Sequence, residues 1–482
     1  MWFRTFASLF ALAIFLNRTF VNEIVETLNG YGAKVACTLY FIQSRPLNDI
    51  DWKELAWPPI SWFVTTTALN DSCVEGRIKF APFLGSRVAC LHEQGSLGCA
   101  LLGKTHKAED YVKSNMLYRK VNGRGDEFSD FAVRALLSGN EILAVDSHFT
   151  DAWINSRAFL VIDASTYPAK ILIECYGDGF NASIPQAGWS MTKSIVSLLV
   201  GALLRSEPNV FPDGLQTNIP LEGTSSATLE QMLRMSDGMD WDEIYGPGMD
   251  PGHMLFHSNN TGYVKKQRTT PGTCFQYSSK TTNVITQYIR TKLGSDAANL
   301  NFPFNLLFRP INANSARMET DASKNFVGSS FSLMTPLDWT RLGVLIANEG
   351  VWPATGKRII DLDYIRKLRE PTKTSRGTYG LHIWLGGNAM DQHSDENDAE
   401  CDKVYPTRVN PSRKWYQKLP KDSLLMTGFE GQYLLVVPKQ KLIMLRLGAS
   451  REKMPFWRRF EPADLFLPVL DHVLKLEETL SV

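Results

Sequence analysis

The chain has 482 residues, a hydrophobic content of 44% and a formal net charge of +1 at pH 7. This length and composition can bury a large core, and the balanced charge, with no basic stripe or tail, argues against nucleic acid as a partner. The 7 cysteines are typical of an exported protein in an oxidising compartment.

An apolar run at residues 6–16 follows Arg4 near the start of the chain. It is shorter than the roughly 20 residues that cross a bilayer comfortably, and it has the pattern of a signal-peptide core. No small-x-small cleavage site follows, so an uncleaved membrane anchor stays open. We expect residues 1–20 to be a signal peptide or anchor and the protein to be exported, to a periplasm, the medium or a secretory lumen.

Residues 21–105 are predicted to form an N-terminal extension, and residues 106–482 a single large domain. Within that domain, residues 106–150 have a helical pattern, and a mostly helical middle extends to about residue 370. β-rich runs predict strands at 158–162 and 170–175, and further strands are predicted at 423–426, 433–437 and 442–447. Strands at both ends of the domain predict one antiparallel sheet built from distant segments, flanked by helices and a helical subdomain.

Two further features concern cysteines and acidic residues. The odd number of cysteines leaves at least one unpaired if all bonds are internal, and a pairing of Cys37 with Cys99 is one guess. The tract from Asn388 to Asn410 is polar and acidic, which predicts an exposed loop. No metal or other cofactor is indicated.

The segment from Gly188 to Ser194 reads Gly-Trp-Ser-Met-Thr-Lys-Ser and precedes an apolar helical run. Residues three apart share one face of a helix, so the Ser190 hydroxyl and the Lys193 amine can meet. A lysine can activate a serine if burial and the helix N-terminus disfavour its charged form. A second Ser-x-x-Lys, at Ser450, has no apolar helix behind it and is predicted to be a solvated loop.

A Pro-Gly turn at residues 271–272 leads to Tyr277, at the point where a short strand gives way to a helix. A tyrosine beside a catalytic lysine can share its proton and pass it to a leaving group. The alternative is a tyrosine that only packs.

These segments resemble the serine β-lactamase-like superfamily of class C type. More narrowly, the Ser190 motif and Pro-Gly-Thr-x-Phe-x-Tyr-Ser-Ser resemble the 6-aminohexanoate-dimer hydrolase and esterase branch. Other matching segments lie at residues 232–241, 327–343, 349–352 and 428–433. The resemblance, which spans about residues 150–470, implies an α/β (α+β) serine β-lactamase-like fold.

The resemblance also implies roles for individual residues. Ser190 would be the nucleophile, and Lys193 and Tyr277 its general base and acid. The backbone N–H groups of Ser190 and Phe429 would form the oxyanion hole. Further residues that the resemblance assigns to substrate binding are Tyr245, Ser279 and Gly428.

Two departures from the β-lactamase pattern narrow the expected substrate. Ser279 replaces the usual Asn two residues after the tyrosine, and Met426 replaces the lysine of the late Lys-Thr-Gly strand. A thioether cannot pair with a substrate carboxylate. We therefore expect a serine esterase or amidase that acts on a small-molecule substrate. The alternatives are a β-lactamase or D-amino-acid peptidase of the same fold, and a catalytically silent binding protein.

Overall fold

The computed structural model describes residues 18–53, 63–92, 97–103, 128–130, 149, 154–221, 226–246, 248–256, 262–263, 265–387, 397–406, 415–450 and 461–480. The chain divides into two compact units, the first made of Met1–Tyr118, Trp241–Val264 and Glu319–Val327 and the second of the remaining residues. Most of the predicted leader lies outside the described residues. None of the helices that the structure describes is both long enough and apolar enough to span a membrane.

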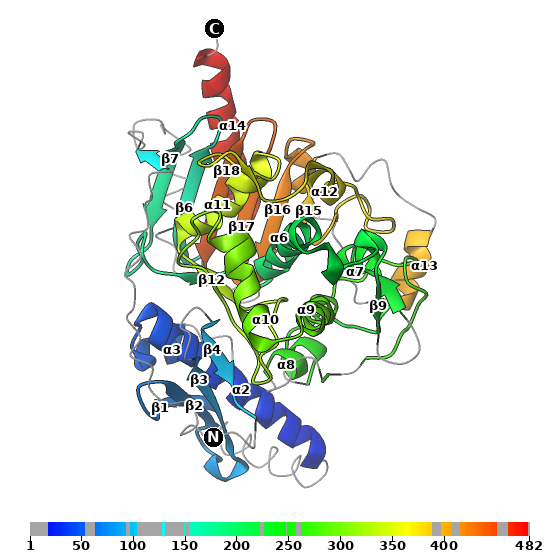
Figure 1. Ribbon diagram of the computed structural model, residues 1–482. Coiled ribbons are helices and arrows are strands. Elements are labelled where there is room, and N and C mark those ends of the chain that lie inside the picture. The colour runs from blue at the N-terminus through cyan, green and yellow to red at the C-terminus, as the bar shows by residue number, and fades with distance from the viewer. Residues whose placement is uncertain are drawn as a thin grey trace. The chain divides into compact units, whose positions relative to one another are not determined.

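The first unit contains a long helix, α2 (Arg18–Gln43), packed on a four-stranded antiparallel sheet (Figure 1). The close approach depends on Gly76, where a Cβ would lie 2.5 Å from the carbonyl oxygen of Asn29 on α2. The elements of this unit are α2, α3 (Leu47–Lys53), α8 (Asp250–Leu255), β1 (Val64–Ala68), β2 (Cys73–Ile78), β3 (Ser86–Leu91) and β4 (Cys99–Leu101).

Disulfides and a buried ion pair hold the first unit together. Cys37 of α2 is bonded to Cys99 of β4, which confirms that predicted pairing, and a second disulfide joins β2 to β3. Next to the Cys37–Cys99 disulfide, the Lys34 amine lies 2.6 Å from the Glu319 carboxylate, which also accepts hydrogen bonds from Thr38 and the Cys99 amide. Glu319 thereby attaches residues 319–327, distant in sequence, to α2 and β4.

The second unit is built on a seven-stranded sheet with the order β15-β16-β17-β18-β6-β7-β5. The predicted sheet from distant segments is confirmed, because β18 pairs antiparallel with β6 across nearly 300 residues of sequence. One edge differs from the prediction: β5 forms within the expected helical region and pairs parallel with β7. The strands are β5 (Phe128–Asp130), β6 (Ser156–Asp163), β7 (Ala169–Tyr176), β15 (Trp384–Leu385), β16 (Leu424–Gly428), β17 (Gln432–Val437) and β18 (Leu442–Gly448).

Helices cover both faces of this sheet. Side chains alternate between faces along a strand. Leu435 and Met444 belong to the hydrophobic core that α14 (Pro462–Leu480) completes, whereas Val436 and Ile443 approach Gly343 of α11 (Pro336–Ala347) on the other face. Met426 pairs with Leu434 on β17 and so shares the face of α11, where it is fully buried.

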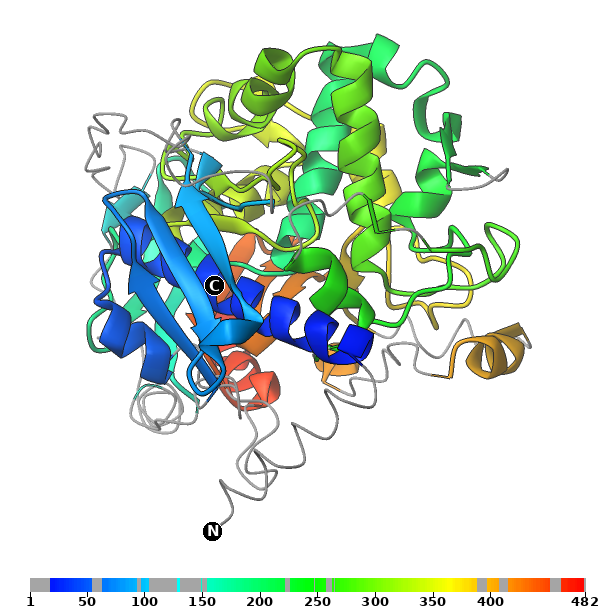
Figure 2. The same ribbon diagram turned by 90° about the horizontal axis from the view of Figure 1, so that it is seen from below.

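The larger of the remaining helices lie on the side of the sheet that α11 covers (Figures 1 and 2). The helices are α6 (Met191–Ser206), α7 (Leu229–Leu233), α9 (Ser279–Leu293), α10 (Asp296–Pro303), α12 (Leu362–Leu368) and α13 (Asn397–Val404). The short strands are β8 (Gln186–Ala187), β9 (Asn218–Pro220), β10 (Ser226–Thr228), β11 (Arg317–Met318), β12 (Ser332–Met334), β13 (Val351–Trp352) and β14 (Lys357–Arg358).

The acidic tract that was predicted to be an exposed loop contains helix α13. Cys401 on this helix is buried and bonded to Cys274, which lies just before Tyr277. The prediction was wrong for residues 397–404 because the disulfide fixes an otherwise polar segment against the domain. The tract therefore contributes a covalent connection to the strand that leads to Tyr277.

Removing this disulfide should destabilise the protein strongly. The bond closes a loop with a sequence separation of 127 residues, so a Cys274→Ala/Cys401→Ala variant should lose about 3–5 kcal/mol of unfolding free energy through the greater entropy of the unfolded chain. Urea unfolding without reductant measures the loss. Cys175→Ala is the matched control, since Cys175 forms no disulfide. An unchanged midpoint in the double variant would contradict the prediction.

Candidate active site

Ser190 lies in a tight turn between β8 and α6. β8 pairs with β12, and the next amide, that of Gly188, donates a 3.0 Å hydrogen bond to the Ser332 carbonyl. Trp189 then adopts a φ of 48°, a left-handed conformation that is uncommon for residues other than glycine. Ser190 is half-buried, and its side chain does not cap α6. The turn therefore leaves the Ser190 hydroxyl available for other contacts.

Two glycines allow the loops around Ser190 to approach each other closely. A Cβ on Gly188 would lie 2.2 Å from the Trp339 ring, and a Cβ on Gly428 would lie 2.1 Å from the Gly188 carbonyl oxygen. The Trp339 indole also donates to the Gln186 carbonyl at 3.1 Å. The end of β16, with Gly428, therefore packs directly on the turn that carries Ser190.

Lys193 is buried and its amine contacts three oxygen atoms. The Nζ atom lies 2.9 Å from Ser190 Oγ, 3.0 Å from Ser279 Oγ and 2.9 Å from the Ser329 carbonyl oxygen. The Lys193 residue is only 1% exposed. Because burial disfavours a positive charge, this environment suits an amine that acts as a base.

Tyr277 lies close to Lys193. Lys193 Nζ lies 4.9 Å from the centroid of the Tyr277 ring, which is stacked on Trp384 with a centroid distance of 5.5 Å. Ser278 then caps α9 by accepting a hydrogen bond from the Thr281 amide, and Ser279 is the first residue of the helix. The structure therefore brings together Ser190, Lys193, Tyr277 and Ser279.

The first turns of α9 carry a polar face that the sequence analysis missed. Thr281 donates to the buried Asp237 carboxylate, and Asn283 Oδ1 accepts from the Ser329 amide at 3.0 Å. Asn283 thereby positions the residue whose carbonyl oxygen binds Lys193. The run of six polar residues at 278–283, where an apolar helix face would normally begin, is the sequence pattern that could have indicated this role.

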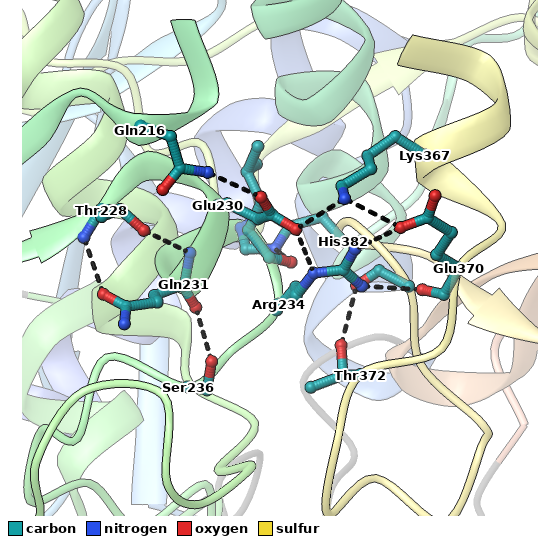
Figure 3. Close-up of polar contacts among 12 residues, drawn as sticks. Gln216, Thr228, Glu230, Gln231, Arg234, Ser236, Lys367, Glu370, Thr372 and His382 are labelled. Carbon is teal, nitrogen blue, oxygen red and sulfur yellow. Dashed lines mark hydrogen bonds and ion pairs between the residues drawn. The ribbon is translucent and has the colours of Figure 1, made fainter. Parts of the chain in front are cut away.

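His382 connects three elements beside this face. Its Nδ1 lies 2.8 Å from the Leu233 carbonyl oxygen and must carry the proton, so Nε2 accepts from Thr282 at 3.0 Å. The His382 carbonyl oxygen accepts from Ser194, which follows Lys193. Figure 3 shows His382 next to the ion pairs of α7, where Arg234 contacts a carboxylate at 2.9 Å. Burial lowers the pKa of His382 to about 3, which keeps the ring neutral.

The buried His382 predicts a loss of stability in acid. Its folded pKa of about 3 is below the ordinary value of 6.5, so the unfolded state binds more protons between these pH values. The contribution of His382 to stability is complete above pH 6.5 and is lost as the pH falls toward 3, by up to about 1.4 kcal/mol per pH unit. Urea unfolding at several pH values should show a shallower dependence for His382→Gln. Equal slopes for the two proteins would count against this account.

Of the other predicted site residues, Phe429 lies beside the Ser190 turn, with its ring 5.7 Å from that of Trp189. Phe429 begins a 3-10 turn at Phe429–Gly431, directly after Gly428, and is half-buried. Tyr245 belongs to the first unit, where its hydroxyl donates to Glu243 at 3.1 Å. The role of Tyr245 toward a substrate therefore stays a prediction.

Ser450, in the second Ser-x-x-Lys match, is not a solvated residue as predicted. It is 1% exposed, and its Oγ contacts the Arg446 guanidinium at 2.6 Å as well as the Ile154 carbonyl oxygen. Ser450 therefore has a structural role at the end of β18.

Among the residues that the structure describes, no group of three or more His, Cys, Asp or Glu side chains is arranged to hold a metal ion.

Neither protein-family models nor curated protein sequences match this chain. Among solved structures, it is similar to a candidate 6-aminohexanoate-dimer hydrolase from Bacillus anthracis, with 17% identity, a TM-score of 0.49, and coverage of 68% of this chain and 80% of that one. It is also similar to a β-lactamase from Mycobacterium bovis, with 14% identity, a TM-score of 0.43, and coverage of 67% of this chain and 94% of that one. A third similar structure is a family VIII carboxylesterase, with 13% identity, a TM-score of 0.46, and coverage of 64% of this chain and 91% of that one.

Proposed function

We propose that this protein is a serine hydrolase that cleaves small ester or amide substrates through an acyl-enzyme on Ser190. One observation carries the proposal: the buried Lys193 amine lies 2.9 Å from the hydroxyl of a half-buried serine at a helix N-terminus. A nucleophile and a base within hydrogen-bond distance are the minimal components of covalent catalysis. Similar structures set the context for this proposal, and the geometry of the chain's own residues supports it.

The three contacts of Lys193 determine how its amine can act. A neutral amine has two N–H donors and one lone pair. The Ser329 carbonyl oxygen can only accept, so it takes one N–H. If Ser279 Oγ accepts the other, the lone pair points at Ser190 Oγ and can remove its proton. Ser279 is therefore proposed to orient the Lys193 amine, rather than to bind the substrate directly.

The reaction then proceeds in two balanced steps. Ser190 Oγ forms a bond to the substrate carbonyl carbon while its proton moves to Lys193 Nζ. As the bond to the leaving group breaks, that proton passes to the leaving group, assisted by Tyr277. Water then attacks the acyl-enzyme and gives a proton to the same pair. As the bond between the acyl carbon and Ser190 Oγ breaks, that proton returns to Ser190 Oγ and the acid is released. The Ser190 and Phe429 amides are proposed to bind the oxyanion, and one such donor is worth about 3 kcal/mol of barrier.

The substrate is proposed to lack the carboxylate that a cation would anchor. The position of the lysine in Lys-Thr-Gly is occupied by Met426, which is fully buried on the face of the sheet that α11 covers. Thr427 and Gly428, which follow it, are half-buried. This arrangement offers no cation from that position of β16, which disfavours a β-lactam or a D-amino-acid peptide as substrate.

Labelling with a fluorophosphonate probe tests the proposal. The folded wild-type protein should form one covalent adduct, and mass spectrometry of its peptides should locate that adduct at Ser190. The peptide that contains Ser450 is the internal control and should stay unlabelled, because Ser450 is buried. Failure of folded protein to react would overturn the proposal, and rapid hydrolysis of nitrocefin would favour a β-lactamase instead.

A further inference from the structure

Three aromatic rings form a cluster around the turn that carries Ser190. The centroid of Trp189 lies 6.0 Å from Phe331 and 5.7 Å from Phe429, in tilted and edge-to-face arrangements. Phe331 is buried, whereas Trp189 and Phe429 are half-buried. The cluster therefore has one buried anchor and two rings that keep part of their surface exposed.

The backbone places this cluster next to the reacting atoms. Trp189 directly precedes Ser190, and Phe429 carries the second amide that we assign to the oxyanion hole. The contact between Gly428 and the Gly188 carbonyl holds the two segments together. A substrate carbonyl bound by the amides of Ser190 and Phe429 would thus lie beside the rings of Trp189 and Phe429.

The exposure and strain of Trp189 are costly unless they serve a purpose. Its left-handed backbone, with a φ of 48°, is unfavourable for a bulky side chain, and an exposed aromatic surface forfeits hydrophobic free energy. A bound apolar group would recover the second cost. By comparison, Phe275 and Tyr379 in the same unit are each only 1% exposed.

We infer that Trp189, Phe331 and Phe429 form the acyl subsite, the part of the site that binds the acyl group of the substrate. This inference rests on the proposed function. The subsite would select neutral, aromatic acyl groups over small ones. Aromatic rings that meet edge to face gain energy beyond their buried area. Buried Met426 supplies no cation for an anionic acyl group. The substrate class is therefore an ester or amide of an aromatic carboxylic acid.

Two sulfonyl fluorides of different size test the subsite without requiring a known substrate. Phenylmethanesulfonyl fluoride and methanesulfonyl fluoride both sulfonylate an activated serine, and only the first presents a ring. The ratio of their second-order rate constants at Ser190, compared between wild type and Trp189→Leu, cancels their different intrinsic reactivities. We expect this ratio to fall about tenfold in Trp189→Leu, the size typical of losing one apolar contact in a pocket.

Phe429→Leu changes a second ring of the same subsite, which directly follows β16, and should also lower the ratio. This variant keeps the test decisive if Trp189→Leu does not fold. The matched control is Tyr288→Leu. Tyr288 lies further along α9 and is a half-buried aromatic residue that stacks on Phe211. The control variant should leave the ratio unchanged. Sulfonylation of Ser190 with an unaltered ratio in both subsite variants would overturn this inference alone, whereas no sulfonylation of wild type would overturn the proposed function.

Discussion

Replacing Ser190 with alanine should abolish turnover of an activated ester, with a fall in kcat of about 10⁵-fold or more. Removal of a nucleophilic serine in comparable machinery costs on the order of 10⁶-fold. The residual rate would come from binding and the oxyanion donors alone. Hydrolysis of a p-nitrophenyl ester by Ser190→Ala, measured beside wild type, gives the ratio directly.

The fold should survive this change, so the loss can be assigned to chemistry. The Ser190 side chain makes no capping hydrogen bond to α6, and the residue is half-buried. We expect the unfolding free energy of Ser190→Ala to stay within about 1 kcal/mol of wild type. Ester hydrolysis retained within tenfold by a folded variant would show that another group is the nucleophile.

The sequence was sufficient to predict the sheet because each strand has a sequence pattern that can be recognised within the strand itself. Runs such as 158–162 and 442–447 are short and mostly apolar, and the turns beside them mark them as buried strands without knowledge of their partners. The parallel edge strand β5 was missed because three residues carry too little pattern. Helix α13 was missed because its position depends on Cys274, which is 127 residues away in sequence.

The candidate site shows the same division between local and long-range information. Helical spacing was enough to predict the contact between Ser190 and Lys193, which the structure places 2.9 Å apart. The contacts of Lys193 with Ser279 and Ser329 could not be predicted, because they join residues 86 and 136 positions apart. The cluster around Trp189 has the same origin, since its partners come from two other segments of the chain.

Replacing Lys193 should slow acylation of Ser190 by about 10³-fold to 10⁴-fold, the upper range for removal of a general base. Two variants separate loss of the base from loss of packing. Lys193→Met fills most of the buried volume and has no base. Lys193→Ala leaves a space where the amine was, next to Ser190, Ser279 and the Ser329 carbonyl oxygen.

A small primary amine added to the solution should therefore rescue Lys193→Ala and not Lys193→Met. Ethylamine can enter the vacated space and offer its lone pair to Ser190, so the rescued rate should rise with the concentration of the unprotonated amine. Single-turnover release of p-nitrophenol measures acylation separately from hydrolysis of the acyl-enzyme. If both folded variants acylated at the wild-type rate, Lys193 would be a structural residue and the base would have to be sought elsewhere, first at Tyr277, whose ring lies 4.9 Å from Lys193 Nζ.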